Sequence, residues 1–205
     1  DHLFLLLHQA QEQDLFLPIN QYEKPFPRFQ TLEEINTLTR KLKKYIYENQ
    51  VADVYGFVEE ICKKNDWPYT QIAHDLLRYQ FMNWVQIQDL TKRGHRIASH
   101  TMTHRVLKFL PEAEKRYELV ESKKRLEGQL KVQTDILVYP YGSMAEIDNA
   151  TVSAAQEAGY QTALMNVQSH SLSNLSLTLP RFAFPPIADT AHLYAIVSGY
   201  KFLFR

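Results

Sequence analysis

The sequence predicts a protein of the α/β class, in which a largely helical N-terminal part is followed by alternating helices and strands. In residues 1–80 apolar side chains recur at helical spacing, and runs of β-branched residues are few. Residues 84–187 hold four short apolar segments separated by helical patterns, an alternation typical of parallel βαβ units. The chain has 205 residues, enough for one domain with a sizeable core or for a domain with a helical appendage.

The N-terminal part contains start and stop signals for several helices. An apolar stripe begins at Leu3, and three prolines between residues 18 and 27 mark a loop. Thr31 and Glu34 have the spacing of a capping box, in which each side chain accepts a hydrogen bond from the other residue's backbone N–H. Helices are expected near residues 31–46, 53–64 and 70–79. No residue in this part suggests chemistry, so we expect it to have a structural role.

The second part opens with a helix near residues 84–92, and Trp84 and Leu90 lie on its apolar face. Asn83 can cap the start of this helix, and Gly94 can end it in the left-handed conformation. The later elements alternate along the chain. Strands are expected near residues 96–99, 135–139, 161–166 and 178–184, and helices near residues 112–130, 146–158 and 190–197.

The composition limits the classes of partner. Basic and acidic residues number 23 each, so the formal net charge is zero, and we expect no nucleic-acid partner because such binding needs a basic surplus. No apolar run has the length of a transmembrane segment. The single cysteine, Cys62, lies in a helical pattern and cannot form an internal disulfide, which leaves the cellular compartment open.

The most informative segment is Gly94-His95-Arg96-Ile97-Ala98-Ser99-His100-Thr101-Met102-Thr103-His104, where a predicted strand leads into two histidines. His100 and His104 are four residues apart, and on a helical turn this spacing directs both rings to one side, where they can bind one metal ion. Eight histidines occur in the chain, so the spacing alone is weak evidence. A surface histidine pair without a metal is the alternative interpretation.

This segment resembles the second motif of the polysaccharide deacetylases, the NodB-homology family or carbohydrate esterase family four. Further similar segments follow in the order that the family has. They are a helix with Glu118, Ser122, Lys123, Leu126 and Glu127, then Leu137-Val138-Tyr139-Pro140-Tyr141-Gly142, then Ala154-Ala155-Gln156-Glu157-Ala158-Gly159-Tyr160, and finally Leu179-Pro180-Arg181. The resemblance runs from about Trp84 to Arg181.

The resemblance implies a partial or distorted β/α barrel with its active site at the C-terminal ends of the strands. Residues 1–80 would then be a helical insertion or lid packed on the barrel, and residues 81–205 the C-terminal part of the barrel. The compartment that the family suggests is the cell envelope or the exterior of the cell. The oligomeric state stays open.

The activity that the resemblance implies is metal-dependent removal of acetyl groups from an N-acetylated polysaccharide or oligosaccharide. His100 and His104 would be two ligands of a divalent metal, with zinc expected first, and the metal would activate a water that attacks the acetyl carbonyl. The backbone N–H of Tyr141 would help to stabilise the oxyanion. Arg181 could pair with a carboxylate in the site. An ordinary turn at Tyr141 and a surface ion pair at Arg181 are the alternatives.

One family motif has no counterpart here. The first motif, Thr-Phe-Asp-Asp, supplies a metal-binding aspartate and the base, and no two aspartates are adjacent in this sequence. Val138 stands where many members have an arginine, and neither His170 nor His192 matches the general acid. Two explanations stay open: the N-terminal region lies outside this chain, which would then be weakly active, or the chain is a catalytically inactive carbohydrate-binding or scaffold relative.

Overall fold

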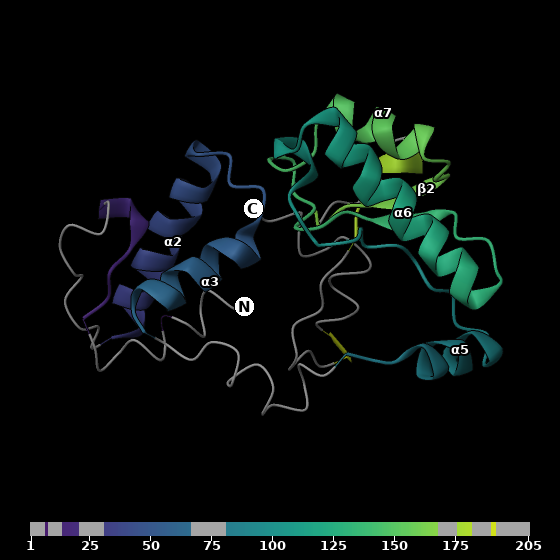
Figure 1. Ribbon diagram of the computed structural model, residues 1–205, viewed down its shortest axis with the longest axis horizontal. Helices are drawn as coiled ribbons and strands as arrows, with labels where there is room; N and C mark the ends of the chain where they lie inside the picture. The colour runs from purple at the N-terminus through teal and green to yellow at the C-terminus, as the bar shows by residue number, and fades with distance from the viewer. Residues whose placement is uncertain are drawn as a thin grey trace. The chain divides into compact units, whose positions relative to one another are not determined.

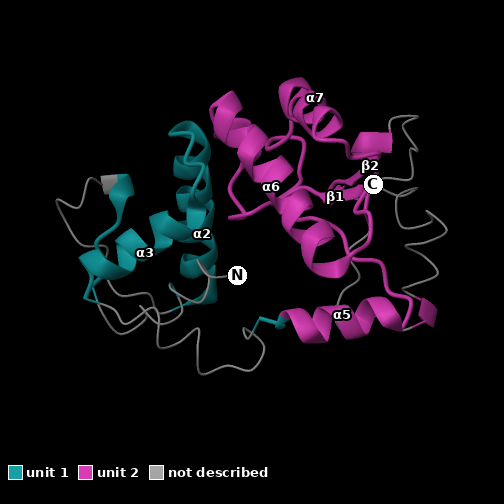
Figure 2. Ribbon diagram, turned by 45° about the vertical axis from the view of Figure 1, so that its right-hand side comes forward, with its two compact units in different colours: residues 1–83 teal, residues 84–205 magenta. Residues whose placement is uncertain are grey.

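The computed structural model describes residues 7, 14–20, 31–66, 81–167, 176–181 and 190–191. The chain forms two compact units, unit 1 (Asp1–Asn83) and unit 2 (Trp84–Arg205), which Figure 2 distinguishes by colour. The expected helix near residues 70–79 and most of the one near 190–197 lie outside the described residues. The role of residues 1–80 as a lid stays a prediction.

Unit 1 contains the short helix η2 (Pro18–Asn20) and the helices α2 (Leu32–Glu48) and α3 (Val54–Lys64), all seen in Figure 1. The predicted capping box is present: Thr31 N donates to Glu34 Oε2 at 3.0 Å, and Glu34 N donates to Thr31 Oγ1 at 3.3 Å. Asp53 caps α3 by accepting a hydrogen bond from Gly56 N at 2.8 Å. These caps satisfy backbone N–H groups that have no partner within the helix, and they set where each helix begins.

The core of unit 1 is formed by the facing apolar sides of α2 and α3. Its members at helical spacing are Ile35, Leu38, Leu42 and Ile46 from α2 and Phe57, Val58, Ile61 and Cys62 from α3. Asn65 links the end of α3 to Phe16, since its side chain bonds the backbone N–H and C=O of that residue at 2.8 and 2.9 Å. Burial, with a contribution from Glu59, raises the pKa of Cys62 to about 11, so this thiol is a packing residue rather than a reactive one.

Unit 2 alternates helices and short strands as the sequence predicts. Its elements are α5 (Trp84–Lys92), η4 (Leu107–Phe109), α6 (Glu112–Leu130), β1 (Ile136–Val138), α7 (Asn149–Glu157), β2 (Thr162–Leu164) and η5 (Ser176–Thr178). Gly94 follows α5 with φ of +87°, the left-handed conformation expected for it. None of the described helices is long and apolar enough to cross a membrane.

The sheet of unit 2 is small and parallel. β1 pairs with β2, with Leu137 opposite Ala163, and single parallel bridges join Ser99 to Leu137 and Leu164 to Leu179. Four chain segments therefore lie side by side in sequence order. The expected strand near residues 96–99 pairs only at Ser99, and the described residues show this parallel sheet rather than a closed barrel.

Helices connect the parallel segments and pack on them. α6 lies between Ser99 and β1 in the chain, α7 lies between β1 and β2, and the two helices contact each other (Figure 1). Ser122 of α6 shares a 2.8 Å hydrogen bond with Ser99, and Tyr160 donates to the carbonyl of Leu119 at 3.0 Å. Both contacts are buried, so they fix α6 against the sheet, whose C-terminal edge carries the predicted site.

Candidate active site

Three of the predicted site residues meet at the C-terminal edge of the sheet. His100 follows the bridge at Ser99, and Tyr141 follows β1. The ring centroids of His100 and His104 are 4.7 Å apart, with the ring planes at 78°. The ring of His104 also lies 5.0 Å from that of Tyr141, at 67°. The histidine pair and the aromatic turn therefore form one cluster.

A backbone carbonyl orients the ring of His100. Nδ1 of His100 lies 2.6 Å from the carbonyl oxygen of Val138, so Nδ1–H donates, and in the neutral form of this ring Nε2 carries the lone pair. The His100 side chain is exposed. Histidines that bind metals through one ring nitrogen usually donate the other N–H to a carbonyl or carboxylate. The geometry of His100 therefore fits a metal ligand that binds through Nε2.

The two histidines are brought together by a loop rather than by a helix. We call residues 100–105 the His loop; it has no helical turn, and Thr101 and His104 have φ of +67° and +58°. Such left-handed conformations cost a non-glycine residue about 1–2 kcal/mol. His104 N donates to Thr101 Oγ1 at 3.2 Å, which ties the two left-handed residues together. The helical spacing that suggested the pair is thus not the reason that the rings meet.

The turn after β1 depends on a glycine. Tyr141 and Gly142 have φ of +60° and +72°, and Gly142 lies so close to its neighbours that a Cβ atom would be 2.8 Å from Asn166 N. The Gly142 carbonyl accepts a hydrogen bond from Asn166 N at 2.7 Å. Tyr139 is buried, donates to Leu177 O at 3.1 Å, and has a pKa raised by burial. The turn is therefore fixed on both sides, while the oxyanion role of the Tyr141 N–H stays a prediction.

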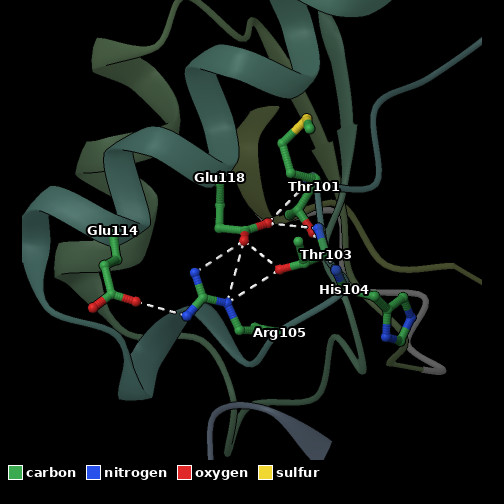
Figure 3. Close-up of polar contacts among 7 residues, drawn as sticks. Thr101, Thr103, His104, Arg105, Glu114 and Glu118 are labelled. Atoms are coloured by element: carbon green, nitrogen blue, oxygen red, sulfur yellow. Dashed lines mark hydrogen bonds and ion pairs between the residues drawn. The ribbon is translucent and has the colours of Figure 1, made fainter. Parts of the chain in front are cut away.

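Glu118 contacts the His loop, although the sequence did not predict this residue as part of the site. It projects from α6 to the His loop, where Oε2 accepts from the N–H groups of Met102 and Thr103, each at 2.8 Å (Figure 3). Oε1 accepts from the Thr103 hydroxyl and from Arg105. Burial alone would raise the pKa of Glu118, but these hydrogen bonds outweigh it and hold the pKa below its ordinary value.

The described ranges do not hold a full set of ligands for a catalytic zinc site. They contain no group of three histidine, cysteine, aspartate or glutamate side chains that could hold one ion. The two imidazoles fit two positions of a zinc site, which in catalytic centres has three protein ligands. Arg181 is exposed after Leu179 and Pro180, and its pairing with a carboxylate stays a prediction.

Comparisons with known proteins found a matching family model and a related protein. A family model described as polysaccharide deacetylase matches residues 33–163, which include α3, the His loop and all but the first residue of α2. YxkH of Bacillus subtilis, named as a polysaccharide deacetylase, is 34% identical over 117 residues, which are 56% of this chain and 41% of YxkH.

A solved structure is similar to this chain in fold. The Streptococcus pyogenes deacetylase PplD in complex with acetate has a TM-score of 0.54 and 22% identity, over 70% of this chain and 65% of that chain. BC0361, a polysaccharide deacetylase from Bacillus cereus, has a TM-score of 0.49 and 20% identity, over 57% of this chain and 36% of that chain. The chain thus spans less than two thirds of the length of these relatives. The family model matches more than half of the residues of this chain, so the chain belongs to the polysaccharide deacetylase family.

Proposed function

We propose that the protein is a metal-dependent deacetylase that hydrolyses N-acetyl groups on an amino-sugar polymer, with His100 and His104 as two ligands of a divalent metal, zinc first. Members of the family are hydrolases that act on acetylated polysaccharides, and divalent metals are general among them. The observation that carries the proposal is the orientation of His100. Its Nδ1–H donates a hydrogen bond to the Val138 carbonyl, and its ring centroid lies 4.7 Å from that of His104.

Different residues of the chain are proposed to bind the metal and to stabilise the oxyanion. A bound divalent metal supplies polarisation of the acetyl carbonyl and a more acidic water. His100 and His104 would hold that metal, and the hydrogen bond from Nδ1 of His100 to the Val138 carbonyl would leave Nε2 as the binding atom. Tyr141, in contact with His104, presents the turn whose N–H is proposed to stabilise the oxyanion. Hydrolysis of an N-acetyl group releases acetate, the molecule bound in the Streptococcus pyogenes relative.

The third metal ligand and the base are proposed to be aspartates like those of the family's first motif. The chain has no adjacent aspartate pair, so we expect the 205 residues alone to bind zinc weakly and to deacetylate slowly. Arg181 is proposed to pair with a carboxylate in the complete site. Residues 1–80 are proposed to act as a lid, with residues 81–205 forming the C-terminal part of a barrel.

The test is release of acetate from N-acetylglucosamine oligomers by the 205-residue chain, with added zinc and with a chelator. We expect slow release that zinc increases, that the chelator stops and that His104→Ala removes. Release that is rapid, or that continues unchanged in the chelator, would contradict the proposal.

The missing aspartate pair also favours a second candidate, a catalytically inactive carbohydrate-binding relative. This candidate predicts that the same oligomers bind to the chain while no acetate appears at any zinc concentration. Calorimetric titration with the oligomers, run beside the acetate assay, separates the two functions.

A further inference from the structure

We propose that Glu118 is a positioning residue of the site: it sets the backbone of the His loop and thereby the relative placement of the His100 and His104 rings. The inference rests on the proposed metal-binding role of this pair. In Figure 3 the dashed lines from the Glu118 carboxylate lead to other groups of the His loop and not to the His104 ring. Glu118 therefore acts through the backbone between the two histidines.

The first argument is the set of groups that Glu118 binds. Its carboxylate accepts two backbone N–H groups, from Met102 and Thr103, and these are the residues in the middle of the His loop. The Thr103 hydroxyl and Arg105 bind the other oxygen. These donors belong to Met102, Thr103 and Arg105, three of the six residues of the His loop. One side chain therefore holds the middle and the end of the loop.

The second argument is backbone strain. The two left-handed residues, Thr101 and His104, lie on either side of the two N–H groups that Glu118 binds. Strained conformations of this kind persist where surrounding contacts determine the backbone, and they are common at functional sites. The bond from His104 N to Thr101 Oγ1 is a single neutral one, whereas the bonds to Glu118 are charge-assisted and stronger. Glu118 is therefore the main contact that opposes relaxation of the loop.

The third argument is that Glu118 is itself held firmly. Its side chain is completely buried and has Arg105 as its counter-ion, and Arg105 in turn binds Glu114 at 2.6 Å. One turn further along α6, Ser122 bonds Ser99, the residue before His100. Helix α6 thus binds both the residue before the His loop and the middle of the loop, so its position sets the positions of both imidazole rings.

The experiment compares Glu118→Gln with Glu114→Gln in the 205-residue chain. Both variants remove one carboxylate from α6 and both alter a partner of Arg105, but Glu114 binds the Arg105 guanidinium rather than a backbone N–H and is half exposed. Zinc is titrated while the ring resonances of His100 and His104 are followed by NMR. We expect Glu118→Gln to weaken zinc binding about tenfold or more and Glu114→Gln to change it less than about twofold.

Two further variants separate positioning from loss of stability. Asp148→Ala removes the cap of α7 in unit 2, where Asp148 binds Thr151, so it should lower the unfolding temperature and leave zinc affinity unchanged. Thr103→Val removes one bond to Glu118 and keeps the side-chain shape, so it should weaken zinc binding by a smaller factor than Glu118→Gln does. It takes the place of Glu118→Gln if that variant does not fold.

The outcomes distinguish this inference from the proposed function. If His104→Ala abolishes zinc binding while folded Glu118→Gln binds as the wild type does, with unchanged ring resonances, the positioning role is wrong and the metal pair stands. If His104→Ala leaves zinc binding unchanged, the proposed metal pair is wrong. Equal losses of affinity in Glu118→Gln and Asp148→Ala would mean that Glu118 only stabilises unit 2, and would also overturn the inference.

Discussion

Gly142 is the residue at which the turn after β1 allows no side chain. Its φ of +72° is unfavourable for other residues, and a Cβ atom would lie 2.8 Å from Asn166 N and 3.1 Å from Tyr139 O. Both neighbours are backbone atoms, so they cannot rotate away. The turn that carries Tyr141 therefore depends on this glycine.

We predict that Gly142→Ala lowers the free energy of unfolding by about 2–4 kcal/mol, from the combined conformational strain and overpacking. The matched control is Gly128→Ala in α6, where a Cβ would meet nothing within 4 Å. That change should stabilise the protein by about 0.5–1 kcal/mol, because alanine favours the helix. Urea unfolding of both variants measures the difference, and equal effects would contradict the close approach at Gly142.

At the scale of the element, α7 depends on the cap at its first turn. Asp148 Oδ1 accepts from Thr151 N at 2.8 Å and from the Thr151 hydroxyl at 2.6 Å. Burial alone would raise the pKa of Asp148, but these bonds, with help from Lys115 and Lys108, lower it below its ordinary value of 3.8. The stabilisation from the charged cap is therefore complete above that value and is lost as the pH falls through the lower folded-state pKa.

We predict that Asp148→Ala costs about 1 kcal/mol at neutral pH, the usual effect of losing an N-cap. The difference from the wild type should shrink in acid, as the wild-type carboxylate becomes protonated. Asp148→Asn keeps a capping oxygen without a charge that titrates, so its stability relative to Asp148→Ala should not depend on pH. Thermal unfolding at neutral and acidic pH checks this, and a constant gap between Asp148→Ala and the wild type would contradict it.

At the scale of the whole molecule, metal binding and folding are linked. A ligand that binds only the folded state stabilises it by an amount that grows with its concentration, about 2.7 kcal/mol at one hundred times the dissociation constant. The ion would bind the His loop after Ser99, and the ring of His104 lies against that of Tyr141 in the turn after β1, so the site contacts two segments of unit 2 that are separated by α6.

We predict that saturating zinc raises the unfolding temperature by several degrees, that a chelator reverses the shift, and that His104→Ala removes it. Differential scanning calorimetry of the 205-residue chain with and without zinc measures this. A shift of the same size in His104→Ala would place the zinc elsewhere.

For the part of the chain that the structure describes, the sequence by itself determined the helices and their order. The capping box at Thr31, the bounds of α5 and α6, and the left-handed Gly94 all agree with the structure. These features depend on interactions between residues at most four positions apart, so the local pattern carries the information. The order of the family's motifs likewise indicated the family before any geometry was known.

Tertiary structure decided the form of the site. The expected strands pair over fewer residues, because pairing depends on neighbours that lie far away in the chain. The sequence predicted that His100 and His104 meet because their spacing suits a helical turn. In the structure a loop with two left-handed residues brings their ring centroids to 4.7 Å from each other. Nothing in the local pattern of α6 distinguishes Glu118 from a solvated glutamate; its role arises from bonds to residues 13–16 positions earlier, which only packing of α6 against the sheet could form.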